Sequence, residues 1–222
     1  MDPIPVGLAA LAVIAAVIDW TAARSGGHIG RRAERVAKPL VMVALIALVA
    51  TWPDDGFAAA GVRPWLLAAL VASLAGDVLL LPPARFVPGV VAFLLAHLAY
   101  LGAFLQVPGS LPWLVVGLAG AGLVAGLIGR RLVPAAARAG FGAPVAIYML
   151  AICAMAVAAT RTGVPAAIAG AWLFVASDSM LAWARFMPPG TPPSMAHRTA
   201  RVAVMPTYHI GQVLLVAALL LG

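Results

Sequence analysis

The sequence contains few charged residues and almost no cysteine. Only 9% of its 222 residues are charged, against about 25% in an ordinary soluble domain, so water cannot be the main solvent of this chain. Cys153 is the only cysteine, which excludes a disulfide within the chain and a zinc site built from several thiolates. We therefore expect a membrane protein whose chemistry depends on other side chains.

Long apolar runs fill most of the chain. Apolar residues make up 64% of it, and the mean hydropathy is +1.06. A membrane-spanning helix needs about 20 residues, so the length leaves room for about eight spans and for no sizeable soluble domain. The sequence predicts an all-α fold, a polytopic bundle of eight transmembrane helices in a single domain over residues 1–222. The runs lie near residues 5–23, 38–52, 62–81, 88–106, 111–129, 142–160, 164–184 and 201–221.

The basic residues predict how these helices are oriented. Twelve lie in or beside the connections after the first, third, fifth and seventh runs, and two, Arg63 and Arg161, lie on the other side. Because positive charge stays in the cytoplasm, we expect these four connections to be cytoplasmic and both termini to be outside. The net charge of +7 then reflects orientation, and nucleic acid is not an expected partner. The twelve residues are Arg24, Arg31, Arg32, Arg35, Lys38, Arg85, Arg130, Arg131, Arg138, Arg185, Arg198 and Arg201.

The two halves of the chain carry similar polar residues in the same order. The third run holds Asp77, and the seventh run holds Asp178. Each aspartate is followed by an Arg-Phe pair, and the next run then holds a histidine, His97 or His209. This order suggests a four-plus-four pseudo-repeat.

These four ionisable side chains lie at similar depth. A charged side chain inside a membrane costs a few kcal/mol, so such residues are the places to look for function. At about 1.5 Å per residue the aspartates lie roughly 6 to 10 Å, and the histidines roughly 12 to 14 Å, from the cytoplasmic ends of their helices. We expect Asp77 and Asp178 to be the catalytic residues of one site. The alternative is that each aspartate only forms hydrogen bonds that hold neighbouring helices together. Asp19 and Arg63, at the ends of runs, need no special account.

Further polar side chains share helical faces with these residues. Positions three or four apart lie on one face of a helix, which places Ser73 beside Asp77 and Tyr100 beside His97. For Tyr148 and Gln212, interhelical hydrogen bonding is the favoured alternative to a role in the chemistry. The residues that we expect to bind substrate are Lys38, Ser73, His97, Tyr100, Tyr148, Ser177, Tyr208, His209 and Gln212.

Basic residues surround the expected cytoplasmic mouth of this site. Lys38 stands at the start of the second run, from where its side chain can extend to the membrane interface. It would bind a lipid phosphate there, or act as a general positive anchor. Together with Arg85, Arg185, Arg198 and Arg201 it would attract an anionic head group while an acyl or alkenyl chain lies between helices.

Two carboxyl groups in a partly dry pocket can divide the work of acid and base. One stays protonated while the other is ionised. That division suits the acid-catalysed addition of water to a polarised bond.

Several short stretches carry a resemblance to a known family. They are Lys38 to Leu40, Ser73 to Asp77, Phe86, Gly89, Phe93, His97 to Tyr100, Tyr148 to Met155, Gly170 to Ser179 and Thr207 to Gln212. With these residues the chain resembles the YhhN-like lysoplasmalogenases, which are membrane proteins of eight spans. His209 departs from the pattern, since this family usually has a second tyrosine there.

The resemblance implies a reaction that the residues alone do not reach. It implies hydrolysis of the vinyl ether bond of a lysoplasmalogen, giving a fatty aldehyde and a glycerophospho-ethanolamine or glycerophosphocholine. Either Asp77 or Asp178 would protonate the outer alkene carbon, while the other would stabilise the cation and orient water. No organic cofactor and no metal would be needed, and the partners would be a lysophospholipid and membrane lipids.

Other functions fit the same residues. Two aspartates and two histidines could form the metal site of a metal-dependent membrane hydrolase, although no paired-histidine spacing supports it. Buried Asp and His could instead relay protons in a transporter or lipid flippase. Another ether lipid or lysophospholipid would also fit the same fold. The scarcity of lysine beside abundant arginine, alanine, glycine and proline favours a GC-rich bacterial genome, and so a multi-pass protein of the cytoplasmic membrane.

Overall fold

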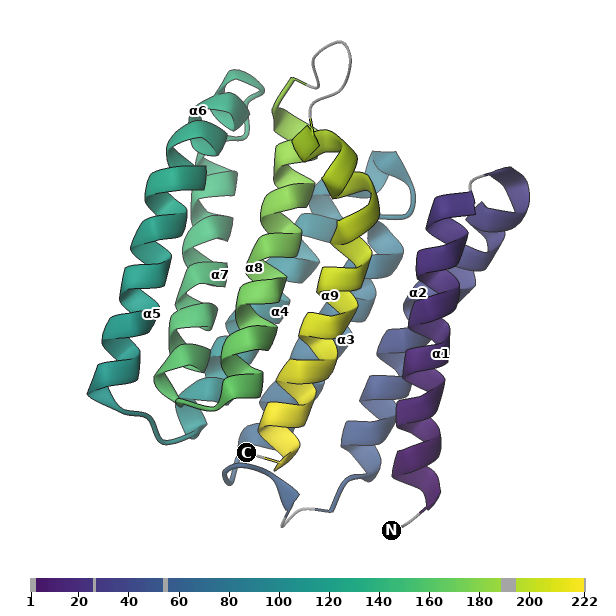
Figure 1. Cartoon of the computed structure of the whole chain (residues 1–222), viewed down its shortest axis with the longest axis vertical. Coiled ribbons are helices and arrows are strands. Elements are labelled where there is room, and N and C mark those ends of the chain that lie inside the picture. The colour runs from purple at the N-terminus through teal and green to yellow at the C-terminus, as the bar shows by residue number, and fades with distance from the viewer. Residues whose placement is uncertain (1–2, 26, 54–55, 189–194, 222) are drawn as a thin grey trace. The chain divides into compact units, whose positions relative to one another are not determined.

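The computed structural model describes residues 3–25, 27–53, 56–188 and 195–221, and the regular structure in these ranges is helical (Figure 1). Helices suit such apolar runs because they satisfy all backbone groups within one segment. A 3-10 turn, η2 (Pro83–Arg85), precedes α4, and a π-helical turn, η3 (Ala125–Gly129), joins α5 to α6 without a break. The helices are α1 (Pro3–Ser25), α2 (Gly27–Thr51), α3 (Val62–Leu79), α4 (Phe86–Gln106), α5 (Leu111–Val124), α6 (Arg130–Arg138), α7 (Gly142–Arg161), α8 (Pro165–Phe186) and α9 (Met195–Leu221).

Seven helical segments in the described part of the chain are long and apolar enough to cross a membrane. They are α1, α3, α4, the continuous segment from α5 to α6, α7, α8 and α9. The remaining helix, α2, carries Arg32, Glu34, Arg35 and Lys38 in its first half, which makes it less apolar. The structure therefore confirms a polytopic helix bundle, while the eighth span stays a prediction.

Three helices extend beyond the apolar runs that predicted them. α2 begins at Gly27 and not near residue 38, α6 carries the fifth run on to Arg138, and α9 begins at Met195 and not near residue 201. The added residues include charged ones such as Arg32, Arg131 and Arg138, and hydropathy marks only the apolar part of a helix. As a result, Lys38 lies inside α2 and not at its start.

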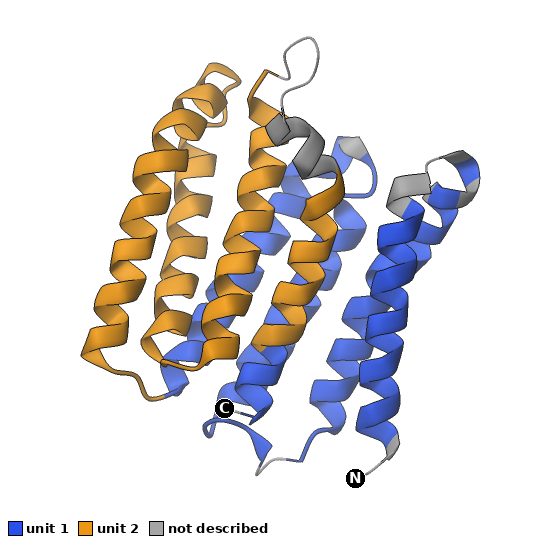
Figure 2. Ribbon diagram, viewed as in Figure 1, with its two compact units in different colours: residues 1–107, 216–222 blue, residues 108–215 orange. Residues whose placement is uncertain are grey.

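The chain divides into two compact units (Figure 2). Unit 1 contains residues 1–107 and 216–222, and unit 2 contains residues 108–215. The single domain over residues 1–222 stays a prediction, and each unit is described by itself.

In unit 1, α1 packs on α2, α2 on α3, and α3 on α4. Large apolar side chains such as Met42, Leu66 and Phe104 fill the core between α2, α3 and α4. The end of α9 joins this unit, where the Ala58 N–H donates to the Leu219 carbonyl (3.0 Å). The first and last helices therefore both reach the end of unit 1 at which α2 connects to α3 (Figure 1).

Arg63 closes the connection between α2 and α3. Its guanidinium donates to the carbonyls of Ala50 (3.0 Å), Val49 and Trp52, and it lies 5.2 Å from the centre of the Phe57 ring. The last carbonyls of a helix have no partner within the helix, so the arginine satisfies the end of α2. This structural role agrees with the expectation that Arg63 needs no special account.

In unit 2, α5 packs on α7, α7 on α8, and α6 on both α7 and α8. Trp172 Nε1–H of α8 donates to Thr160 Oγ1 of α7 (3.0 Å). Two glycines let α8 and α9 approach closely, since a Cβ atom at Gly170 would lie 2.9 Å from the Gly211 carbonyl oxygen. This close approach sets the position of the polar side chains on both helices.

Candidate functional site

The predicted site residues fall into two groups, one in each unit. The unit 1 group is Lys38, Ser73, Asp77, His97 and Tyr100. The unit 2 group is Tyr148, Ser177, Asp178, Tyr208, His209 and Gln212. The structure brings residues together within each group, while the union of Asp77 and Asp178 in one site stays a prediction.

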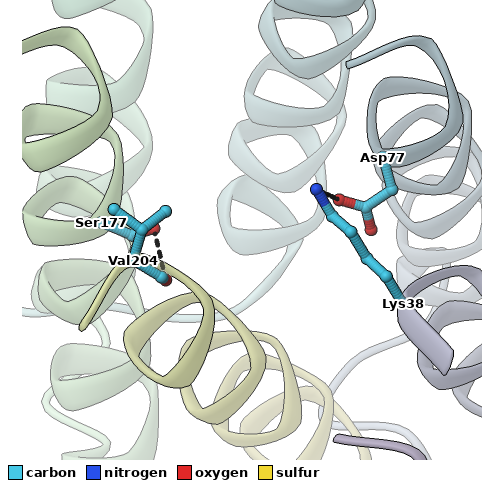
Figure 3. A network of polar contacts seen from close by, with 4 residues as sticks. All are labelled: Lys38, Asp77, Ser177 and Val204. Carbon is cyan, nitrogen blue, oxygen red and sulfur yellow. Dashed lines mark hydrogen bonds and ion pairs between the residues drawn. The ribbon is translucent and has the colours of Figure 1, made fainter. Parts of the chain in front are cut away.

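Lys38 and Asp77 form an ion pair inside unit 1 (Figure 3). Lys38 Nζ of α2 lies 3.3 Å from Asp77 Oδ1 of α3, and the two residues are 6% and 0% exposed. Lys38 stands at the start of the second apolar run but within α2, which begins at Gly27. A buried ion pair adds little net stability, since the loss of hydration offsets the attraction. Its main effect is to hold the Asp77 carboxyl against a fixed positive charge.

Asp19 is a further buried carboxyl of unit 1. It is 0% exposed and lies on α1, which packs on α2, the helix that carries Lys38. The view that it needs no special account is wrong, because α1 continues to Ser25 and Asp19 lies on its buried face. Helical spacing of small residues could have revealed this, since small residues mark the packed face of a membrane helix. The buried face of α1 holds Ala12, Ala15, Ala16, Asp19 and Ala22.

The three other predicted residues of unit 1, Ser73, His97 and Tyr100, are also buried. Ser73 shares the buried face of α3 with Asp77, and Tyr100 shares that of α4 with His97, as the spacing predicts. His97 Nδ1 is hydrogen bonded to the Phe93 carbonyl. Because a carbonyl only accepts, Nδ1 carries a hydrogen and donates it.

Tyr148 and Asp178 form the central contact of the unit 2 group. Tyr148 Oη of α7 donates to Asp178 Oδ2 of α8 at 2.5 Å. The interhelical hydrogen bond favoured for Tyr148 is therefore confirmed. A phenol that donates to a carboxylate fixes its orientation and stabilises its negative charge.

Ser177 contacts the backbone of α9 beside a proline. Its Oγ donates to the Val204 carbonyl at 3.0 Å (Figure 3). Pro206 lies inside α9 and has no N–H, which removes a backbone hydrogen bond from the preceding turn. Thr207 Oγ1 also donates to carbonyls of this turn, those of Ala203 (2.7 Å) and Val204 (3.0 Å). Two side-chain hydroxyls thus donate to carbonyls of the turn that precedes Pro206.

The remaining predicted residues of unit 2 lie on α9 and are buried. The Tyr208 ring meets the Phe174 ring edge to face, with centroids 5.3 Å apart. The His209 ring lies 5.3 Å from that of Tyr208, and Gln212 follows about one turn later. Substrate binding by these three residues stays a prediction.

The expected basic mouth is described only in part. Arg85 and Arg185 are exposed, and the Arg185 guanidinium lies 5.5 Å from the Phe186 ring centre. The side chains of Arg198 and Arg201 lie outside the described residues.

Both groups contain side chains that general acid–base chemistry uses. Unit 1 holds a carboxyl paired with an ammonium and an imidazole that donates from Nδ1, and unit 2 holds a carboxyl bound by a phenol. Among the side chains that the structure describes, no group of three or more His, Cys, Asp or Glu could hold a metal ion. The contacts within each unit supply proton donors and acceptors.

Comparison with known proteins identifies the family. The model of the YhhN family matches residues 33–219. The human lysoplasmalogenase TMEM86B is 36% identical over 155 residues, which cover 70% of this chain and 63% of the human protein. A lysoplasmalogenase of Mycobacterium bovis is 32% identical over 169 residues, which cover 72% of this chain and 62% of that protein. The chain thus spans less than two thirds of these relatives, and no solved structure matches it significantly. The chain belongs to the YhhN family.

Proposed function

We propose that this protein is a lysoplasmalogenase that hydrolyses the vinyl ether bond of a lysoplasmalogen in the membrane. Its products are a fatty aldehyde and a glycerophospho-ethanolamine or glycerophosphocholine. Membership of the YhhN family and the lysoplasmalogenase names of the human and mycobacterial relatives support this proposal.

The observation that carries the proposal is the pairing of both aspartates with proton-bearing partners. Asp77 is paired with the Lys38 ammonium, and Asp178 accepts a hydrogen bond from Tyr148. A carboxyl group must be held in a defined position to deliver a proton or to stabilise a cation. These contacts supply that position within each unit.

The reaction begins when a general acid protonates the outer carbon of the alkene. The resulting oxocarbenium ion is stabilised by a carboxylate and captured by water, and the hemiacetal then collapses to the aldehyde and the alcohol. One of Asp77 and Asp178 delivers the proton, and the other stabilises the cation and orients the water. The residues that position the substrate are Lys38, Ser73, His97, Tyr100, Tyr148, Ser177, Tyr208, His209 and Gln212.

The topology that we propose has eight spans, both termini outside and the site toward the cytoplasm of a bacterial cell. Within each unit, the positions of the arginines in the sequence support it. In unit 1 they lie near the junction of α1 and α2 and, as Arg85 alone, between α3 and α4; in unit 2 they lie in α6, at the end of α8 and at the start of α9. The order of Asp and His residues supports a four-plus-four pseudo-repeat.

Mass spectrometry of the products tests the function. Purified protein is given a lysoplasmalogen or the matched ester lysolipid, and we expect fatty aldehyde only from the vinyl ether. Asp77→Asn and Asp178→Asn should each lower turnover by about a hundredfold or more, the usual scale of general acid–base catalysis. Asp54→Asn is the matched control, because it makes the same change from a carboxyl to an amide and Asp54 is not among the proposed site residues.

Two results would contradict these proposals in different ways. If folded wild-type protein releases no aldehyde, the proposed lysoplasmalogenase activity is wrong. If a folded Asp77→Asn or Asp178→Asn variant keeps full turnover, the proposed activity holds but that aspartate is not catalytic.

A further inference from the structure

The Lys38 side chain extends into unit 1 and meets Asp77 there (Figure 3). Its Nζ lies 3.3 Å from Asp77 Oδ1, and the two side chains are 7% and 0% exposed. A lysine that extends to the membrane interface keeps its ammonium in contact with water or head groups. Arg85 and Arg185 are exposed in that way, but Lys38 is not. The Lys38 ammonium is therefore directed at a carboxyl group inside the protein.

Apolar side chains lie next to this ion pair along α2. Val41 and Met42 follow Lys38 by about one turn on the same face of the helix, and both are 0% exposed. Opposite charges attract each other more strongly in such surroundings than in water, because the medium screens them less. An opposite charge at this distance stabilises the ionised form of a carboxyl group. The ammonium thus stabilises Asp77 as a carboxylate.

We propose that Lys38 is a positioning residue that keeps Asp77 as a carboxylate, so that Asp77 is the aspartate that faces the oxocarbenium ion and orients the water. This inference rests on the proposed function and deepens it by assigning the two roles. A general acid must hold a proton when the substrate binds, and a carboxylate holds none. Asp178 is then the acid, and Tyr148 stabilises the carboxylate that forms when Asp178 gives up its proton.

In this assignment each proton has a defined donor and acceptor. The O–H bond of the Asp178 carboxylic acid breaks, and the alkene electrons form the new C–H bond at the outer carbon. Water then forms a C–O bond to the oxocarbenium carbon and gives one proton to the Asp77 carboxylate. When the hemiacetal collapses, its hydroxyl proton passes to Asp178, the bond to the leaving oxygen breaks, and that oxygen takes the proton from Asp77. Both aspartates return to their starting states.

Infrared difference spectra test the state of Asp77 without reference to turnover, because carboxylates and carboxylic acids absorb at different frequencies. The spectrum of wild type minus that of Asp77→Asn should contain a carboxylate band. The same subtraction in a Lys38→Met background should contain a carboxylic acid band, because the stabilising charge is gone. Lys38→Arg is the matched control, since it keeps the charge and should keep the carboxylate band.

Either of two spectra would overturn the proposal. One is a carboxylic acid band of Asp77 in the wild-type subtraction, and the other is an unchanged carboxylate band in the Lys38→Met background. If Lys38→Met does not fold, the wild-type subtraction decides by itself.

Steady-state kinetics with a lysoplasmalogen test how Lys38 acts. Lys38→Met should lower kcat by roughly a hundredfold, the scale of general acid–base catalysis, with little change in KM. Lys38→Arg should stay within about tenfold of wild type, because it keeps the charge but not the shape of the ammonium. Direct binding of a lipid phosphate by Lys38 predicts instead a raised KM and an unchanged kcat, and that result would overturn the proposal.

A double variant shows whether Lys38 acts through Asp77. Adding Lys38→Met to Asp77→Asn should lower kcat no further than Asp77→Asn does alone, because the carboxylate that Lys38 stabilises is already gone. If the two losses multiply, Lys38 acts independently of Asp77 and the proposal is wrong.

The spectra and the turnover separate this proposal from the proposed function. If the spectra behave as expected but wild type releases no aldehyde, the pairing that keeps Asp77 ionised holds and the lysoplasmalogenase activity is wrong. If wild type is active and its Asp77 band is that of a carboxylic acid, the activity holds and the assignment of the two aspartates is wrong.

Discussion

At the scale of single residues, the behaviour of a carboxyl group inside a membrane protein depends on the donor beside it. Asp77 lies against the Lys38 ammonium, which is a full charge, whereas Asp178 accepts from the Tyr148 hydroxyl, which is a dipole. Loss of the ammonium leaves a charge uncompensated, and loss of the phenol hydroxyl removes only one hydrogen bond. The two aspartates should therefore respond differently when their partners are changed.

Tyr148→Phe should lower turnover by about tenfold to a hundredfold while the protein remains folded. The substitution keeps the ring and removes only the donor to Asp178, and a hydrogen bond to a charged group contributes about 1.5 to 3 kcal/mol. Aldehyde release measures the loss, and thermal unfolding in the same detergent checks the fold. Wild-type turnover in this variant would mean that the hydrogen bond serves packing alone.

At the scale of helices, the approach of α8 to α9 places several site residues of unit 2. Gly170 and Gly211 leave no room for a side chain between the two backbones. Their contact allows Ser177 to reach the Val204 carbonyl and Phe174 to meet Tyr208. A change in the helix separation should therefore disturb stability and site together.

Gly170→Ala should lower the free energy of unfolding by about 1 to 3 kcal/mol, the usual cost of overpacking. Its Cβ atom would lie 2.9 Å from a backbone oxygen, which cannot rotate away as the end of a side chain can. Gly122→Ala in α5 is the matched control, since a Cβ atom there meets nothing within 4 Å. The control should be neutral or stabilising by up to about 1 kcal/mol. Equal thermal stability of the two variants would show that the close approach is not needed.

The helices also show what hydropathy can and cannot locate. Each apolar run coincides with helical structure to within about two residues, but a hydropathy scale reads the charged first turns of α2 as a connection between helices. Side-chain spacing correctly placed Ser73 with Asp77 on one face of α3. It could not reveal the Lys38–Asp77 and Tyr148–Asp178 contacts, because spacing along one helix carries no information about which helix lies opposite.

Asp19 shows a further limit of reasoning from hydropathy. On α1 the large side chains Leu11, Ile14 and Ile18 are exposed, whereas alanines and Asp19 are buried. In a membrane protein large apolar residues can face lipid while small ones face neighbouring helices. A pattern based on large residues alone therefore points to the wrong face of this helix.

At the scale of the whole molecule, α2 decides the number of spans. Its apolar second half is bounded by a charged first half, and Lys38 lies buried between them. If α2 crosses the membrane, its charged turns belong to the cytoplasmic interface and the chain has eight spans. If it does not, the described helices leave seven, and the termini lie on opposite sides.

Single cysteines on either side of α2 distinguish these topologies. Cys153 is buried and is the only cysteine, so Cys153→Ser provides a background without thiols. His28 and Ala60 are exposed and flank the apolar part of α2. In intact cells a membrane-impermeant thiol reagent should label Ala60→Cys, while His28→Cys should react only when the cytoplasmic face is open. Ala84→Cys, beyond α3, should behave like His28→Cys. Labelling of His28→Cys and Ala60→Cys from the same side would show that α2 does not span, because one crossing must separate its two ends.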